Sequence, residues 1–262
     1  MRPELTYGSY LHIDELLELQ QGVSDPPEHD EHLFIVVHQV YELWFKQILH
    51  ELDRFVENID ADHPHRGTHQ LKRVLKILKT IVAQVDVLET MTPLDFVSFR
   101  SRLEGASGFQ SVQFRELEFR LGLKDRAHLE RLEGLTTRPD RLRRRFEEPS
   151  VWDAWLAFLA RAGHPVPVEV LERDPTEPVR PHPGVQEVLV AIYRDHPALA
   201  EICELLTDMD EGLMEWRYRH VMMVQRTIGA KPGTGGSAGA AYLRTTLFRP
   251  AFPDLWEIRT AF

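Results

Sequence analysis

The sequence predicts an all-α fold with long helices around one core, and two observations support this prediction. Apolar residues recur at alternating spacings of three and four over three long stretches, which is the pattern of a helix with one buried face. The signals of β-strands are nearly absent. A chain of 262 residues suits one large domain, so we expect residues 1–262 to form a single all-α domain.

Composition and charge narrow the class of protein further. The single cysteine, Cys203, argues against a disulfide framework and against a thiolate metal cluster. The formal net charge of −10 argues against a general nucleic-acid binder and against binding to anionic membranes. The first residues carry no apolar leader segment, and no apolar run approaches the roughly 18 residues of a membrane span. We therefore expect a cytoplasmic protein that binds neither nucleic acid nor membrane.

Two long helices are predicted in the first third of the chain. The first runs from Glu31 to about Asp60, and its apolar stripe keeps a regular spacing when His38 is counted as a member. The second runs from Thr68, its expected N-cap, to about Glu89. Each stripe marks the face that its helix buries.

Shorter helices are predicted next. Thr92-Pro93-Leu94-Asp95 combines an N-cap, a proline at the first helical position and an acid in the first turn, so it should open a helix that reaches Arg100. Further helices are expected from about Phe109 to Leu121 and from Val151 to Ala162. The basic run from Arg141 to Arg145 is interpreted as the solvated face of a helix rather than as a nucleic-acid patch.

The last part of the chain begins with a connection and ends with the third long helix. Six prolines between His164 and Gly184 exclude a regular helix there and predict a long surface connection. The last long helix should begin near Pro197 and stop at Gly229, and its stripe includes His220. A glycine-rich segment, residues 233–239, follows it and could fold over a ligand.

His38 and His220 are the candidate cofactor ligands, because each interrupts an apolar stripe. A lone buried histidine is usually a hydrogen-bonded core residue, and this interpretation remains an alternative for both histidines. Burial keeps the imidazole neutral, which is also the form that binds a metal. Two such residues in one core favour a cofactor between the helices, and a neutral imidazole in an apolar pocket is a common ligand of haem iron.

Other chemistry is less well supported by the motifs. No histidine has a glutamate three residues before it, as the di-iron bundle signature requires, and His-Glu-x-x-His is absent. Two further histidine groups, around His29 and His63, lie in polar connecting sequence. Gly235-Gly236-Ser237-Ala238-Gly239 has the letters of a serine-hydrolase elbow, but a helix and a Lys-Pro turn precede it where a strand is needed.

Arg100 is the candidate for binding an anion. It follows Phe96 and Phe99, and an arginine beside aromatic residues can bind a carboxylate with two parallel hydrogen bonds where water is excluded. A surface arginine whose stem covers Phe99 is an equally good reading of the pattern. Thr234, in the glycine-rich segment, could add a hydroxyl group to the same ligand.

The motifs, taken together and in order, resemble the tryptophan 2,3-dioxygenase family. They cover nearly the whole chain, most weakly between about Lys124 and Pro197. The segments that carry the resemblance are Leu5–Leu11, His29–Glu31, Phe34–Gln39, Glu42–Trp44, Leu88–Pro93, Phe99-Arg100, Ser107–Ser111, Gln113–Arg115, Trp216–His220 and Gly233–Ser237.

The resemblance implies a haem-binding helical subunit and a role for each candidate residue. It implies that haem b is bound with His220 as the proximal iron ligand, and that Ser107 and Gly108 lie close to it. It implies that His38, the catalytic residue, accepts a hydrogen bond from the indole N–H of L-tryptophan, while Arg100 and Thr234 hold its carboxylate and ammonium groups. It also implies a homotetramer whose N-terminal segments reach into neighbouring subunits. The further substrate-binding residues that it implies are Phe34, Val36, Val37, Phe96, Phe99, Leu103, Tyr7, Tyr10 and Leu11.

The activity implied by the resemblance is insertion of both atoms of O2 across the indole C2–C3 bond of L-tryptophan, with the iron active as Fe(II). The product would be N-formyl-L-kynurenine, the first product of the kynurenine pathway. Three alternatives stay open at this point: a related haem monooxygenase that acts on an indole or phenol, a non-catalytic haem-binding protein, and a purely structural bundle. The mass of the product would distinguish the monooxygenase from the dioxygenase. Consumption of tryptophan would exclude the non-catalytic haem-binding protein, and binding of haem would exclude the purely structural bundle.

Overall fold

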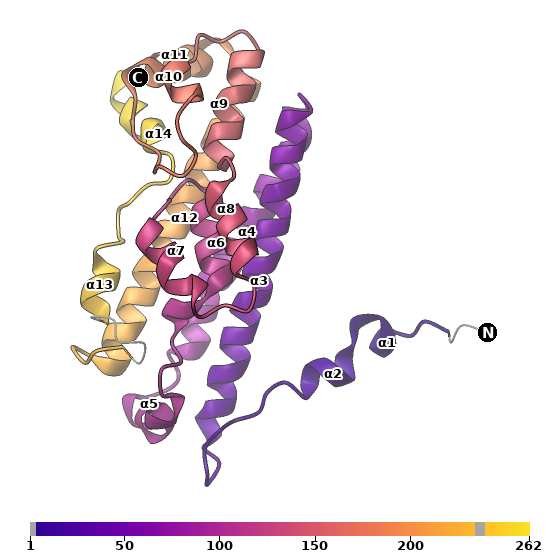
Figure 1. Ribbon diagram of the computed structural model, residues 1–262, viewed down its shortest axis with the longest axis vertical. Helices are drawn as coiled ribbons and strands as arrows, with labels where there is room; N and C mark the ends of the chain where they lie inside the picture. The colour runs from indigo at the N-terminus through magenta and orange to yellow at the C-terminus, as the bar shows by residue number, and fades with distance from the viewer. Residues whose placement is uncertain (1–3, 234–238) are drawn as a thin grey trace.

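Three long helices form the frame of the protein in a computed structural model that describes residues 4–233 and 239–262. They are α3 (His29–Asp60), α4 (Pro64–Leu88) and α12 (Pro197–Ile228). Figure 1 shows them side by side, and α4 packs against both α3 and α12. Within the described ranges every regular element is a helix, so the predicted all-α fold is confirmed.

The remaining elements are short helices that cover the frame. One group, which includes α10, α11 and α14, lies at the end of the frame where the C-terminus is (Figure 1). None of the described helices is both long and apolar enough to cross a bilayer. Their bounds are α1 (Tyr7–Leu11), α2 (Ile13–Leu17), α5 (Pro93–Arg100), α6 (Val112–Arg120), α7 (Arg126–Glu133), α8 (Pro139–Glu147), α9 (Val151–Arg161), α10 (Val168–Leu171), α11 (Pro183–Asp195), α13 (Ala240–Arg244) and α14 (Pro253–Glu257), with short 3₁₀ turns at Ser101–Leu103, Gly108–Gln110 and Ile258–Ala261.

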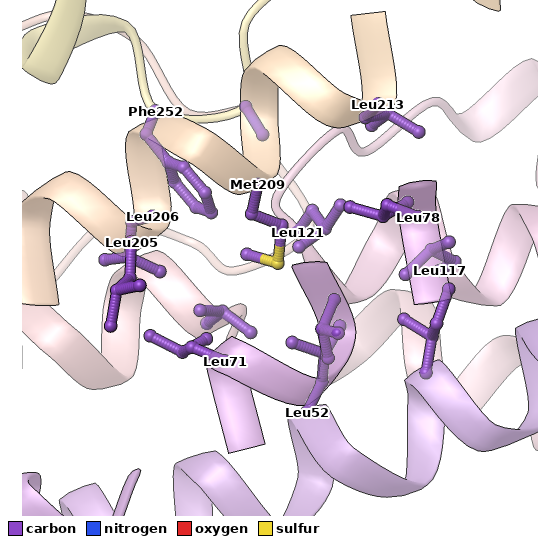
Figure 2. Close-up of a cluster of buried hydrophobic side chains, with 14 of the residues drawn as sticks. Leu52, Leu71, Leu78, Leu117, Leu121, Leu205, Leu206, Met209, Leu213 and Phe252 are labelled. Carbon is purple, nitrogen blue, oxygen red and sulfur yellow. The ribbon is translucent and has the colours of Figure 1, made fainter. Parts of the chain in front are cut away.

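The core lies where the apolar stripes of the long helices meet. Figure 2 shows Leu206 and Met209 of α12 beside Leu71 of α4 and Leu52 of α3. Leu52, Leu71 and Leu206 are fully buried, and truncation of such a leucine to alanine costs about 2–5 kcal/mol. The same cluster includes residues before and after the proline-rich connection, so helices from both sides of that connection share one core.

Most predicted helices are present, with small differences at their ends. The first and last long helices extend over His29–Asp60 and Pro197–Ile228, and Gly229 is the C-cap of the latter. Thr92 caps α5 as predicted: its Oγ1 accepts from the backbone N–H of Asp95, whose carboxylate accepts from the backbone N–H of Thr92. The prediction that the proline-rich connection holds no regular helix is wrong: α10 lies within it, and α11 already begins at Pro183, since a proline suits the first helical position.

Two other predictions about helices also need correction. Thr68 is not the N-cap of α4, because that helix begins one turn earlier at Pro64, whose fixed φ suits the first helical position. The run from Arg141 to Arg145 is only partly solvated. Arg145 donates to both carboxylate oxygens of Asp53 at 2.7 and 2.8 Å, and Arg141 lies 2.8 Å from the buried carboxylate of Glu116.

The N-terminal segment that contains α1 and α2 projects away from the bundle (Figure 1). Its apolar side chains are exposed to an unusual degree: Tyr7 is 77% exposed, Tyr10 67% and Leu17 67%. A hydrogen bond from Gln20 to Gln39 at 2.6 Å joins the end of this segment to α3. A run of exposed apolar side chains on a projecting arm is typical of a surface that another chain covers.

Candidate active site

A cavity of about 240 Å³ lies among α3, α4, α5, α6 and α12. Its walls are mainly apolar, and His38 and His220 both line it. The sequence predicted both histidines as candidate cofactor ligands from two separate helices, and the fold brings them to one cavity. A mostly apolar cavity with a few polar groups is the usual form of a ligand site in proteins.

His38 is held by its own helix. Its Nδ1 atom lies 2.7 Å from the carbonyl oxygen of Phe34, one turn earlier on α3. A carbonyl oxygen only accepts, so Nδ1 carries the proton and Nε2 of the neutral ring is an acceptor. Burial lowers the pKa of His38, against the opposing effects of the Phe34 hydrogen bond and of Glu42, which keeps the ring neutral near pH 7.

His220 is the more strongly perturbed of the two histidines. Burial, together with the nearby His38, lowers its pKa to about 4. Its ring stacks on Trp216 of the same helix, with ring centroids 5.2 Å apart and the planes within 6° of parallel. Neither ring nitrogen has a hydrogen-bond partner among residues 4–233 and 239–262. The ring therefore offers the cavity an uncharged nitrogen whose lone pair can bind a metal.

An aromatic cluster forms the wall beside His38. The Phe34 ring lies 4.0 Å from the His38 ring and 5.9 Å from the Phe96 ring, measured between centroids. Phe99 is fully buried behind these two rings, with its centroid 5.6 Å from that of Phe34, and Leu103 completes the apolar wall. Such a wall favours a flat aromatic ligand and excludes water.

Arg100 also lines the cavity. It is half-buried, and its Nη2 atom donates to the carbonyl oxygen of Pro232 at 2.5 Å. Pro232 comes two residues before Thr234, which lies outside the described residues. Arg100 therefore lies at the cavity wall and contacts the segment after α12, so its role in binding stays a prediction for which its position is suitable.

Ser107 and Gly108 form a narrow turn at the cavity wall. The hydroxyl oxygen of Ser107 accepts from the backbone N–H of Phe109 at 3.3 Å and so starts the 3₁₀ turn Gly108–Gln110. A Cβ atom added to Gly108 would meet no atom within 4 Å, so this side of the backbone is open. A large flat group could approach the chain closely here.

Six of the predicted substrate-binding residues that the structure describes do not line the cavity of this chain. One is Phe99, which is fully buried behind the cavity wall. Val37 belongs to the core, where its carbonyl oxygen accepts from Gln84 at 3.0 Å, and Val36 is half-buried on α3 away from the cavity lining. The other three, Tyr7, Tyr10 and Leu11, lie on the projecting α1.

Sequence reasoning missed a buried ionic group in the same wall. Arg115 and Glu118 of α6 and Arg217 of α12 line the cavity, and Glu118 accepts from both arginines. A signal was present, because Arg115 and Glu118 are three residues apart, as are Arg217 and His220, so each pair shares a helix face. The pairing across the two helices depends on tertiary packing, which no local pattern contains.

The residues present fit a haem. His220 offers a neutral imidazole with no competing hydrogen bond among the described residues, Gly108 leaves the backbone open, and the remaining walls are mainly apolar. In the same cavity, Nε2 of His38 can accept a hydrogen bond from a ligand, and Arg100 can bind an anionic group. Together these groups can hold a flat cofactor and a flat zwitterionic ligand.

Comparison with known proteins gives a consistent result. The sequence model of the family described as tryptophan 2,3-dioxygenase matches residues 2–131 and 181–262. Similar proteins named tryptophan 2,3-dioxygenase include one from Herpetosiphon aurantiacus, 56% identical over 259 residues that cover 99% of each chain. Another, from Anaeromyxobacter dehalogenans, is 56% identical over 98% of this chain and 96% of the relative. A third, from Myxococcus xanthus, is 44% identical over 97% and 89% of the two chains.

Proposed function

This chain belongs to the tryptophan 2,3-dioxygenase family, and we propose that its cavity is the place where O2 is added to L-tryptophan. The enzyme inserts both oxygen atoms across the indole C2–C3 bond and releases N-formyl-L-kynurenine, in the catabolism of tryptophan. The observation that carries the placement is the pair of half-buried histidines, both with lowered pKa values, that line one apolar cavity from α3 and α12.

The family is haem-dependent, and His220 is the residue that would hold the iron in this chain. It provides the uncharged imidazole that iron requires, and its low pKa prevents protonation from competing with the metal over the neutral pH range. Haem b, one per subunit, would supply a ferrous centre for the activation of O2. Ser107 and Gly108 would lie beside it, because their turn leaves the backbone open to the cavity.

The substrate would lie between this cofactor and the wall formed by Phe34, Phe96 and Leu103. Arg100 binds the carboxylate of the amino acid, and Thr234 of the following segment contributes to its polar end. The contact of Arg100 with Pro232 supports this arrangement, since it places the arginine beside the start of that segment. Selection for the free amino acid follows, because a ligand without a carboxylate loses the charge-assisted hydrogen bond to Arg100, which contributes about 1.5–3 kcal/mol.

His38 would orient the indole. Its Nε2 atom is the acceptor on the neutral ring, and the indole N–H is a donor only, so the two match. The low pKa makes His38 a weak base at neutral pH. Addition at C2=C3 does not require prior removal of the indole proton, so a hydrogen-bond acceptor in a fixed position is sufficient.

We propose that four chains assemble and that the N-terminal segment completes a neighbouring site. The exposed Tyr7, Tyr10 and Leu11 on a projecting arm support this proposal, because they have no place in the cavity of their own chain. Apolar side chains of this size at the mouth of a partner's cavity would help to exclude water from it.

The test is a reaction of the haem-loaded, reduced protein with L-tryptophan under air. We expect N-formyl-L-kynurenine, identified by its absorbance and by a product mass that is two oxygen atoms above that of tryptophan. A product with one added oxygen atom would instead support a monooxygenase. A haem-loaded, reduced protein that leaves tryptophan unchanged would contradict the proposed placement and leave haem binding as the only role of the cavity.

A further inference from the structure

A buried ionic cluster forms part of the cavity wall, on α6 and α12. Glu118 accepts from Arg115 and, at 2.8 Å, from Nη2 of Arg217. All three residues are deeply buried, with exposed fractions of 5–7%. Two guanidinium groups therefore share one carboxylate, and a buried charge without a partner is costly.

The two arginines differ in how well their donors are used. Arg217 also donates through Nη1 to the carbonyl oxygens of Thr246 and Arg249 at 3.3 and 3.2 Å. Among the residues that the structure describes, Glu118 is the only hydrogen-bond acceptor of Arg115. The Nε atom of Arg115 is completely buried and has no acceptor there. The unused hydrogen-bonding capacity of the cluster is thus concentrated on Arg115, which lines the cavity.

The other charged groups near this cluster do not supply the missing anion. Asp210 lies near Arg217, but its carboxylate accepts from the backbone N–H groups of Ala251 and Phe252 and from the indole of Trp256.

Asp125 is not available to Arg115 either. It is half exposed at the surface, where it pairs with His128 at 3.1 Å. Arg131, which lies against the Phe109 ring, adds a further positive charge. An anionic group inside the cavity would satisfy Arg115.

Aromatic packing holds the guanidinium of Arg115 in place. Its central carbon lies 4.9 Å from the centroid of the Phe109 ring. Phe109 is itself held edge-on by Tyr242, with ring centroids 5.3 Å apart, and the Tyr242 hydroxyl group lies 2.7 Å from Nε2 of His128. The group is therefore preorganised, which reduces the entropy lost when a ligand binds.

We propose that Arg115 binds a propionate carboxylate of the haem. This inference rests on the proposed function, in which the cavity takes a haem and Arg100 takes the carboxylate of tryptophan. Haem b carries two carboxylates, and a guanidinium matches a carboxylate in charge and in geometry. Arg115 is then the residue that distinguishes haem from an uncharged porphyrin.

The test compares two ligands and two forms of the full-length protein. Protein produced without added haem is titrated with haemin and with haemin dimethyl ester, whose carboxylates are blocked, and the Soret band reports the Kd. In the unaltered protein we expect haemin to bind more tightly than its diester. Arg115→Gln should weaken haemin binding roughly 10- to 100-fold, the usual range for a charge-assisted hydrogen bond, and should leave diester binding unchanged.

Two further variants give the controls. Arg131→Gln removes an exposed arginine from the same Phe109 ring, 5.0 Å from its centroid, and should change neither affinity. Arg115→Lys keeps the charge and should retain part of the preference for haemin, which decides the question if Arg115→Gln does not fold. Equal weakening of both ligands by Arg115→Gln would overturn the proposal, because Arg115 would then act only by holding Glu118.

Failure of the proposed function gives a different result. An unaltered protein that binds neither porphyrin contradicts the placement of haem in the cavity. An unaltered protein that binds haemin and its diester equally well, and still converts tryptophan, contradicts only the assignment of Arg115.

Discussion

The hydrogen bond from Nδ1 of His38 to the carbonyl oxygen of Phe34 decides what this histidine can do, because it leaves Nε2 as an acceptor. We expect His38→Ala to keep its haem, since His220 is the residue proposed to hold the iron, and to lose only part of its turnover. The measurement is the Soret spectrum together with kcat and KM. A complete loss of turnover with normal tryptophan binding would show that His38 acts as an obligatory base.

Arg100 provides a second prediction at the scale of the residue. Arg100→Ala should raise the KM for tryptophan roughly 10- to 100-fold, since loss of a charge-assisted hydrogen bond costs about 1.5–3 kcal/mol, while haem content stays the same. Tryptamine, which has no carboxylate, should react equally poorly with both proteins. Arg102→Ala is the matched control, because Arg102 is outside the cavity lining. An unaltered KM would show that the contact with Pro232 is only structural.

The site residues that could be predicted are those that interrupt an apolar stripe in the sequence. Those that depend on the packing of one helix against another could not be predicted. His38 and His220 each stand in an apolar stripe, so spacing alone selects them. The demand of Arg115 for an anion depends on Glu118 being shared with Arg217, and that sharing exists only once α6 packs beside α12. Charged residues in a sequence do not reveal which of them will be buried together.

Helix ends were predictable where the local chemistry is complete. The pattern Thr92-Pro93-Leu94-Asp95 contains every part of a capping box, and α5 begins there. Thr68 has the right type for an N-cap, but Pro64 can begin the helix one turn earlier, and the longer helix buries more of its stripe. Helix α11 was not predicted, because its first residues belong to the proline-rich stretch.

Lys124 stabilises the C-terminal end of helix α8 by hydrogen bonds to its carbonyl oxygens. Its ammonium group donates to the carbonyl oxygens of Arg145, Phe146 and Glu148 at 2.9, 2.7 and 2.9 Å. Burial lowers the pKa of Lys124 to about 7. The unfolded chain keeps this proton up to about pH 10.5, so between pH 7 and 10.5 the unfolded state binds more protons and stability rises with pH.

Lys124→Met should lack this rise. The difference in unfolding free energy between the unaltered protein and Lys124→Met should grow by about 1 kcal/mol per pH unit above pH 7 and stay constant below it. Denaturant unfolding at several pH values measures it. Lys72→Met is the control, since the Lys72 side chain is 57% exposed in its pair with Glu201 and should give parallel curves. Parallel curves for Lys124→Met as well would mean that Lys124 titrates normally.

At the scale of the whole molecule, the projecting N-terminal segment leads to a prediction about assembly. If Tyr7 and Tyr10 enter a neighbouring subunit, replacement of both by serine should raise the KM for tryptophan and reduce the population of tetramer. Light scattering gives the mass, to be compared with four chains of 30.4 kDa each. Leu135→Ala is the control, because Leu135 is another exposed apolar residue, at 58%. A protein that is monomeric and fully active before any substitution would contradict the shared site.

The three-helix frame has one more consequence. The two histidines stand on α3 and α12, and both of these helices pack against α4, whose Val85 and Leu88 reach the cavity wall. The relative positions of the two histidine-bearing helices are therefore set in part by a helix that carries neither histidine. A bulkier or smaller side chain at position 85 would change the room along that wall of the cavity, and with it the range of substituted indoles that can enter.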